Sequence, residues 1–178
     1  METQENAFKE IIKYGLILGF IQISLTILMY LIDINLLVGF KGAGIRLLLV
    51  AILVIFFAIR IRTLQGGFMT FGEGFKAMFI MGLIGMLMET TLMYALYNFI
   101  DTDLAEQTKQ ITMNTTQEML EKFNVPADQM EKSMEEIEKQ DFSYSILKML
   151  QAILGSTIIG SGFSAIVAAI IKKESKLF

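Results

Sequence analysis

The chain has 178 residues, of which 54% are hydrophobic, and its mean hydropathy of +0.57 exceeds what a soluble domain can hide. It contains neither Cys nor His, which excludes disulfides, thiolate nucleophiles, imidazole bases and nearly every zinc, haem or iron–sulfur site, so no cofactor is expected. The net charge of −3 includes no basic stripe that could neutralise a run of phosphates, so nucleic-acid binding is not expected either.

Four apolar stretches are long enough to cross a bilayer as helices, which takes about 20 residues. They cover residues 14–32, 45–61, 76–100 and 147–171. Residues 1–10 are mixed in charge and no cleavage site follows the first stretch, which predicts an uncleaved span and not a signal peptide. The expected fold is an all-α integral membrane protein, a four-transmembrane-helix bundle whose first partner is the lipid bilayer.

The connection between the first two spans, residues 33–44, is short and contains Gly39, Gly42 and Gly44. Glycines favour turns, and short connections join antiparallel neighbours. A tight hairpin of spans one and two is therefore expected.

A capped loop, residues 60–76, precedes the third span. Gly66 and Gly67 permit the chain to reverse, and Thr70 with Glu73 forms the pattern of a capping box. We expect the third helix to begin at Phe71.

Glu89 stands out because a carboxylate inside an apolar span is costly. Counting from an inner boundary at Met78, a rise of about 1.5 Å per residue places it roughly 16 Å deep in a core about 30 Å thick. The same arithmetic places five amide and hydroxyl side chains at similar depth: Gln22, Ser24, Thr26, Thr157 and Ser161. No Lys or Arg is expected there, so Glu89 is predicted to be protonated or hydrogen-bonded to this layer. It is either a structural contact between helices or a proton or cation site.

Residues 101–141 form an acidic segment that holds 11 of the 18 acidic residues. Apolar residues recur at helical spacing in two stretches, first Leu104, Ile111, Leu120 and Phe123, then Met130, Met134 and Ile137. Asn124 can end the first helix and Pro126 suits the start of the second. A helical hairpin is expected, either a packed spacer with a solvated face or a site for a partner or cation.

The fourth span carries small residues four apart, namely Ser156, Gly160, Ser164 and Ala168, with a second row at Ser161, Ala165 and Ala169. Such rows allow helix backbones to approach closely. They predict that this helix lies at the centre of the bundle or also contacts a second copy of the chain.

Several of these features together resemble a family of small bacterial membrane proteins that is known only as a domain of unknown function, DUF4199. They are the stretch GGFMTFGEGFKAMF at residues 66–79, the EEIEKQ run of the acidic hairpin and the closing IVAAIIKK. The resemblance covers nearly the whole chain, from about Tyr14 to Lys173. It implies a four-span inner-membrane protein and assigns no functional residues.

Basic residues near the span ends predict the orientation, because they resist translocation. If both termini lie in the cytoplasm, only Lys41 and Arg46 lie outside and eight basic residues lie inside. These eight are Lys9, Lys13, Arg60, Arg62, Lys76, Lys172, Lys173 and Lys176. The expected organisation is spans one to three with a cytoplasmic loop at 60–76 (residues 1–100), an extracytoplasmic hairpin (101–141), and span four with a basic cytoplasmic tail (142–178).

The residues are compatible with two classes of function and disfavour a third. A structural or interaction component of the cytoplasmic membrane is expected, with another membrane protein or a second copy as partner. The alternative is a small proton- or cation-linked transporter or channel that uses Glu89. An enzyme is not expected, because one buried carboxylate cannot supply both an acid and a base.

Overall fold

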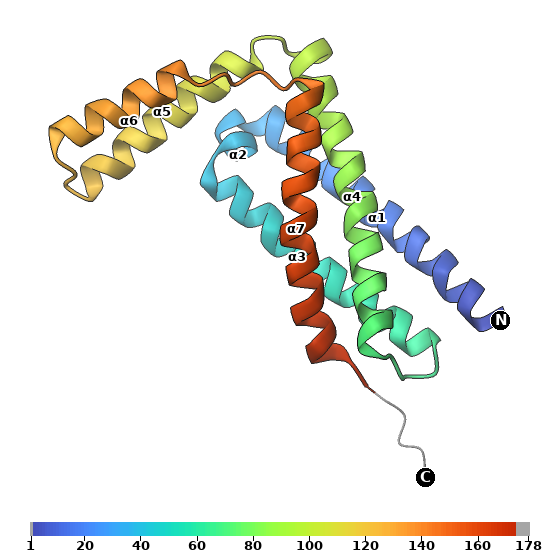
Figure 1. The fold of residues 1–178 in the computed structure, drawn as a ribbon. Coiled ribbons are helices and arrows are strands. Elements are labelled where there is room, and N and C mark those ends of the chain that lie inside the picture. Colours follow the sequence, from blue (N-terminus) through green and yellow to red (C-terminus); the bar gives the residue numbers. More distant parts are fainter. Residues whose placement is uncertain (1, 174–178) are drawn as a thin grey trace.

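The computed structural model describes residues 2–173 and is almost entirely helical (Figure 1). The elements are α1 Glu2–Ile32, α2 Ile34–Val38, α3 Phe40–Leu64, α4 Phe71–Ala95, the π-helical turn η1 Leu96–Ile100, α5 Leu104–Lys122, α6 Ala127–Lys139 and α7 Ile146–Ile171. Four segments of the described chain are long and apolar enough to cross a membrane: Asn6–Ile32, Phe40–Leu64, Phe71–Ile100 and Ile146–Ile171. The four-helix membrane architecture is thereby confirmed. The basic tail beyond Lys173, with Lys176, lies outside the described residues.

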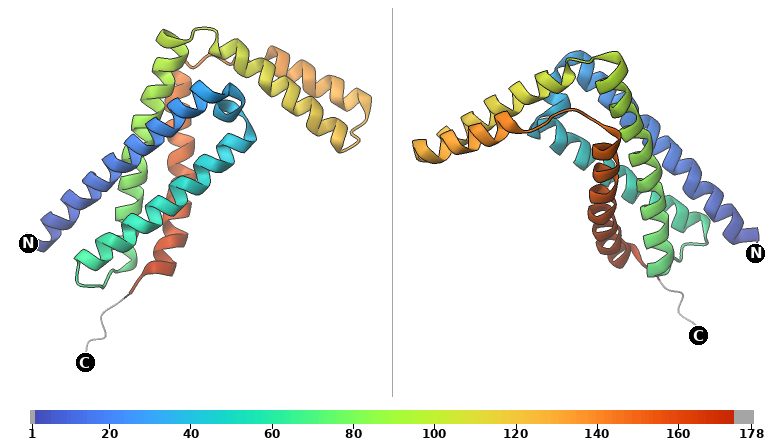
Figure 2. Two further views of the ribbon diagram at one scale, coloured as in Figure 1. Left: turned by 180° about the vertical axis from the view of Figure 1, so that it is seen from behind. Right: turned by 45° about the horizontal axis from the view of Figure 1, so that its top comes forward.

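The bundle is organised around α4, which packs against α1 on one side and α7 on the other. Helices α1 and α3 are inclined steeply to α4 and α7 in every view (Figures 1 and 2). The prediction that the fourth span lies at the centre is wrong, because α7 packs mainly on α4. Its small residues are shared between that contact and outward faces, where Gly155 and Gly162 are exposed.

The contact between α1 and α4 depends on glycines. A Cβ at Gly15 would lie 2.8 Å from Cδ1 of Ile84 and 3.3 Å from Cα of Met81, and a Cβ at Gly19 would collide with the sulfur of Met88. Gly15-x-x-x-Gly19 is the small-residue spacing that lets two membrane helices approach closely. This pair was not identified from the sequence, although the G-x-x-x-G pattern in an apolar run is a signal that could have found it.

The connection between α1 and α3 is more helical than its glycines suggested. Asp33 caps α2 by accepting a hydrogen bond from the Asn35 amide, and α3 already begins at Phe40. Gly42 therefore lies within α3, where a Cβ would collide with the carbonyl oxygen of Leu36. Here glycine permits close packing of α2 on α3 and does not break a helix.

At the end of the bundle near residues 65–70, called the loop end below, backbone contacts tie the α3–α4 loop to α7. Met69 and Lys173 exchange two amide-to-carbonyl hydrogen bonds of 2.9 Å, and Arg62 donates to the carbonyl of Ile171 at 2.8 Å. Arg62 thus satisfies one of the carbonyls that the last turn of α7 leaves free. The loop and the end of the fourth span form one unit.

Helices α5 and α6 form an antiparallel arm that projects from the opposite end of the bundle, the hairpin end (Figures 1 and 2). Asn124 takes a left-handed conformation with φ of 52°, and the Val125 amide bonds to the Leu120 carbonyl at 3.0 Å, which closes α5. Leu104 is fully buried where the arm meets the bundle, whereas Phe123 at the tip is 72% exposed. Of the residues in the predicted apolar pattern, Leu104 therefore packs on the bundle and Phe123 is exposed at the tip.

Candidate functional site

The centre of the candidate site is an ion pair between Arg46 of α3 and Glu89 of α4. Nη1 of Arg46 lies 3.1 Å from Oε1 of Glu89, and both side chains are about one fifth exposed, at 23% and 21%. The hydroxyl of Thr26, which is completely buried on α1, donates to the same oxygen at 3.3 Å. Glu89 therefore links three of the four spans.

This pairing corrects the expectation that no Lys or Arg reaches Glu89. Arg46 was assigned to a connector outside the membrane, but α3 begins at Phe40, so Arg46 lies about 9 Å along the helix. Its second guanidinium nitrogen donates to the Leu37 carbonyl of α2 at 2.8 Å. A carboxylate in an apolar span needs a partner, and the arginine at the start of the neighbouring span provides one.

The predicted polar layer is smaller than expected. Gln22 and Thr26 are buried on α1, on the side that faces α4. The other three hydroxyls bond to carbonyls of their own helices, Ser24 to Phe20 at 2.8 Å, Thr157 to Ile153 at 2.7 Å and Ser161 to Ile158 at 2.7 Å. The structure brings together Gln22, Thr26 and Glu89, adds Arg46, and places Thr157 at the same cavity as Gln22 and Glu89.

Gln22 has a buried polar atom that lacks a hydrogen-bond partner among the described residues. It is 8% exposed, and its Oε1 is buried with no hydrogen-bond partner among the described residues. Its amide oxygen lies against Gly85 of α4, where any Cβ would collide with it. Buried polar groups are normally paired, and an unpaired one in a native structure requires a physical reason.

A cavity of about 370 Å³ lies between α3, α4 and α7, with Gln22 as its contribution from α1. Polar groups line it at Gln22, Glu89, Ser156, Thr157 and Ser164, and the remaining walls are apolar, with Val50, Val54, Met78 and Phe163 among them. Of the predicted packing residues, Ser156, Gly160 and Ser164 line this cavity, and Ala168 is buried against Gly74 of α4.

The capping box at the loop end has both of its hydrogen bonds. Thr70 Oγ1 accepts from the Glu73 amide at 3.3 Å, and the Glu73 carboxylate accepts from the Thr70 amide at 2.7 Å. These residues begin α4 at Phe71 and take no part in the cavity.

The arm is attached to the hairpin end by hydrogen bonds at the start of α5. Tyr30 of α1 donates to Asp101 at 3.1 Å, and Gln107 donates to the same carboxylate at 3.3 Å. Tyr97 of η1 lies 2.7 Å from the hydroxyl of Thr108. Helix α5 therefore leaves the bundle at a defined angle.

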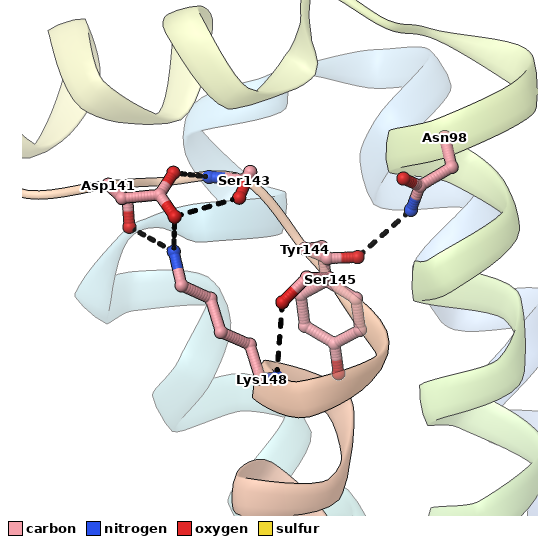
Figure 3. A network of polar contacts seen from close by, with 6 residues as sticks. All are labelled: Asn98, Asp141, Ser143, Tyr144, Ser145 and Lys148. Carbon is pink, nitrogen blue, oxygen red and sulfur yellow. Dashed lines mark hydrogen bonds and ion pairs between the residues drawn. The ribbon is translucent and has the colours of Figure 1, made fainter.

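The return connection from α6 to α7 is fixed by a second polar network (Figure 3). Lys148 forms a 2.7 Å ion pair with Asp141 and also bonds to its backbone carbonyl, while Ser145 caps α7. The hydrogen bond from Lys148, with two more from Ser143, lowers the pKa of Asp141 to about 2. Asn98 donates to the Tyr144 carbonyl at 2.9 Å, which joins this connection, residues 140–145 and called the strap below, to η1.

The family comparison covers nearly all of the chain. A family model described as protein of unknown function (DUF4199) matches residues 13–173. No curated protein and no solved structure shows a significant match. The match spans all four membrane-crossing helices and the acidic arm, and the chain belongs to the DUF4199 family.

Proposed function

We propose that this protein is a structural or interaction component of a bacterial cytoplasmic membrane, with the α5–α6 arm as its contact surface on the outer side. The observation that carries the proposal is the attachment of the arm. Within residues 2–173 the arm meets the bundle at its base, mainly through α2 and η1, and polar contacts fix both chain connections there. A rigid projection of this kind presents a surface at a fixed position above the membrane.

The surface chemistry of the arm suits contact with a protein. Helix α6 has no buried residue, and its acidic side chains are exposed. They do not converge on a metal site anywhere in the described chain. At the tip Phe123 is 72% exposed and Met119 41% exposed, which gives an apolar anchor inside an acidic rim. The partner is another membrane protein or a second copy.

Glu89 is a structural tie in this proposal. Arg46 and Thr26 already occupy its Oε1, which supports a role in holding α1, α3 and α4 together. Glu89→Gln is expected to weaken the fold without creating or abolishing proton or cation flux in proteoliposomes. Flux that depends on Glu89 in a correctly folded protein would favour the transporter instead.

The orientation of the chain in the membrane is tested in intact cells. The chain has no cysteine, so Asn114→Cys on α5 and Thr63→Cys near the loop end give single labelling sites, both exposed. An impermeant maleimide is expected to label position 114 and to spare position 63. Labelling of position 63 alone would overturn the orientation.

The contact itself is tested with a photo-crosslinking residue at Phe123, using Leu154 on the exposed face of α7 as the matched apolar control. A discrete adduct from position 123 that disappears when Glu131, Glu135 and Glu138 become Gln supports the proposal. Equal adducts from both positions, or none from position 123, would contradict it.

A further inference from the structure

We propose that the cavity between α3, α4 and α7 binds a neutral, hydroxyl-bearing lipid from the bilayer, with its hydroxyl at Gln22 and Glu89. This inference concerns a face of the bundle that the proposed contact surface does not use. Its volume of about 370 Å³ lies within the range of small-molecule sites, about 300–1,000 Å³.

The unpaired oxygen of Gln22 indicates a hydrogen-bond donor. Oε1 of Gln22 has no hydrogen-bond partner among the described residues and lies against Gly85, while the side chain lines the cavity, so a turn of its terminal amide would present this oxygen to a ligand. At Glu89 the hydrogen bonds from Thr26 and Arg46 both go to Oε1, so the second carboxylate oxygen is available to another donor. A hydroxyl carries one donor, so it can pair either Oε1 of Gln22 or the second oxygen of Glu89, one at a time, while its own oxygen can accept a hydrogen bond.

The ion pair selects against charged ligands. Arg46 already neutralises Glu89, so a second cation would gain little from this site. An anion would meet the Glu89 carboxylate and offers no donor to Gln22. Charged groups also leave the membrane interface only at high cost, whereas a single hydroxyl costs less and recovers part of that cost when it is hydrogen-bonded in the cavity. Charge complementarity therefore favours a neutral polar group.

The walls of the cavity indicate the rest of the ligand. From Glu89 to Met78 the cavity follows α4 for about 16 Å, calculated from the helical rise. Over this distance apolar side chains of α3, α4 and α7 line it, among them Val54, Met86 and Phe163. Among the described residues, α4 packs against both α3 and α7, whereas α3 and α7 hardly contact each other. The cavity therefore lies between two helices that face lipid. A hydrocarbon chain can enter from the bilayer.

Gly160 and Gly162 provide a matched pair of variants on α7. Both glycines have open space where a Cβ would lie, but only Gly160 lines the cavity, and Gly162 is exposed on the outside. Gly160→Leu is expected to fill the cavity, and Gly162→Leu controls for the added side chain. Gly82→Met fills the cavity from α4 and serves as a second blocking variant.

The experiment uses the full chain in lipid nanodiscs with a diazirine-bearing hexadecanol as the probe, and mass spectrometry locates the adducts. Labelling is expected on α4 and α7 residues that line the cavity. It is expected to fall about tenfold in Gly160→Leu and Gly82→Met but not in Gly162→Leu. Circular dichroism establishes that each variant is folded. Equal labelling in Gly160→Leu and Gly162→Leu would overturn the proposal.

The chemistry of the head group is tested on the intact cavity. Unlabelled hexadecanol is expected to compete better than its methyl ether, which lacks the donor, and better than hexadecyl sulfonate, which is an anion. Gln22→Leu is expected to reduce the preference for the alcohol over the ether by about threefold to tenfold, the effect of one hydrogen bond. Ser24→Ala, an exposed change on the same helix, should leave it unchanged. Equal competition by all three compounds would refute the role of Gln22 and Glu89.

Discussion

The two sides of α4 differ in how they use small residues. Toward α1, glycines bring the helices so close that side chains of one touch the backbone of the other, as at Gly15 and Gly19. Toward α3 and α7, Gly82 and Gly160 have open space beside them and line a cavity. The same residue type thus makes a close contact on one side and a void on the other. The spacing of the small residues alone does not distinguish these two uses. The neighbouring helix determines whether the missing side chain leaves a close contact or a void.

The ion pair joins these two sides, and breaking it is expected to have the largest effect. Arg46→Met leaves the Glu89 carboxylate without its cation and should lower the free energy of unfolding by about 2–3 kcal/mol, somewhat less than for a fully buried pair. The double variant Arg46→Met with Glu89→Gln should recover most of that loss, since no uncompensated charge remains. Chemical unfolding in detergent micelles measures both. A double variant no more stable than Arg46→Met would contradict this role.

Overfilling the α1 side is expected to have the next largest effect. Gly15→Leu should destabilise the protein by about 1–3 kcal/mol, because atoms of Ile84 and Met81 already occupy the space. Gly160→Leu is the matched change on the cavity side and should be neutral or stabilising by about 0.5–1 kcal/mol, because it fills a void. Thermal unfolding of the two variants compares the two sides. An equal loss of stability in Gly15→Leu and Gly160→Leu would contradict this difference between the two sides of α4.

The smallest expected effect is confined to the strap between α6 and α7. The pKa of Asp141 is lowered from 3.8 to about 2 in the folded protein, so its ion pair with Lys148 contributes fully above pH 3.8 and is lost as the pH falls toward 2. At pH 7 the ion pair makes its full contribution to stability, and a change of one pH unit in either direction does not alter it. Carboxyl titration by NMR, with Asp141→Asn as the reference, measures it. A midpoint near 3.8 would show that Lys148 does not hold Asp141 in solution.

The sequence predicted the long-range architecture well because lipid imposes a strong pattern. A run of about 20 apolar residues is a requirement of bilayer thickness, and four such runs are visible without any knowledge of packing. Local signals were also sufficient at Thr70 and Glu73, where the capping box lies within one turn. Asn124 and Pro126 mark the turn of the arm for the same reason.

The site could be predicted only in part, because it depends on which helices are neighbours. Glu89, Gln22 and Thr26 were identified by polarity and depth, which are properties of single spans. Arg46 was not identified as a partner, since the start of α3 was placed five residues too late, at Ile45 instead of Phe40. The void beside Gly160 depends on the inclination of α3, which no pattern within α7 records.

The pairing of Arg46 with Glu89 has a consequence for how the protein is made. The ribosome adds Arg46 43 residues before Glu89, an interval of about 2–9 s at about 5–20 residues per second. During that time the Glu89 carboxylate does not yet exist, whereas the Leu37 carbonyl, nine residues before Arg46, is an acceptor that is already synthesised. Before the third span is synthesised, the Leu37 carbonyl of α2 is therefore the acceptor that this guanidinium has within its own stretch of chain.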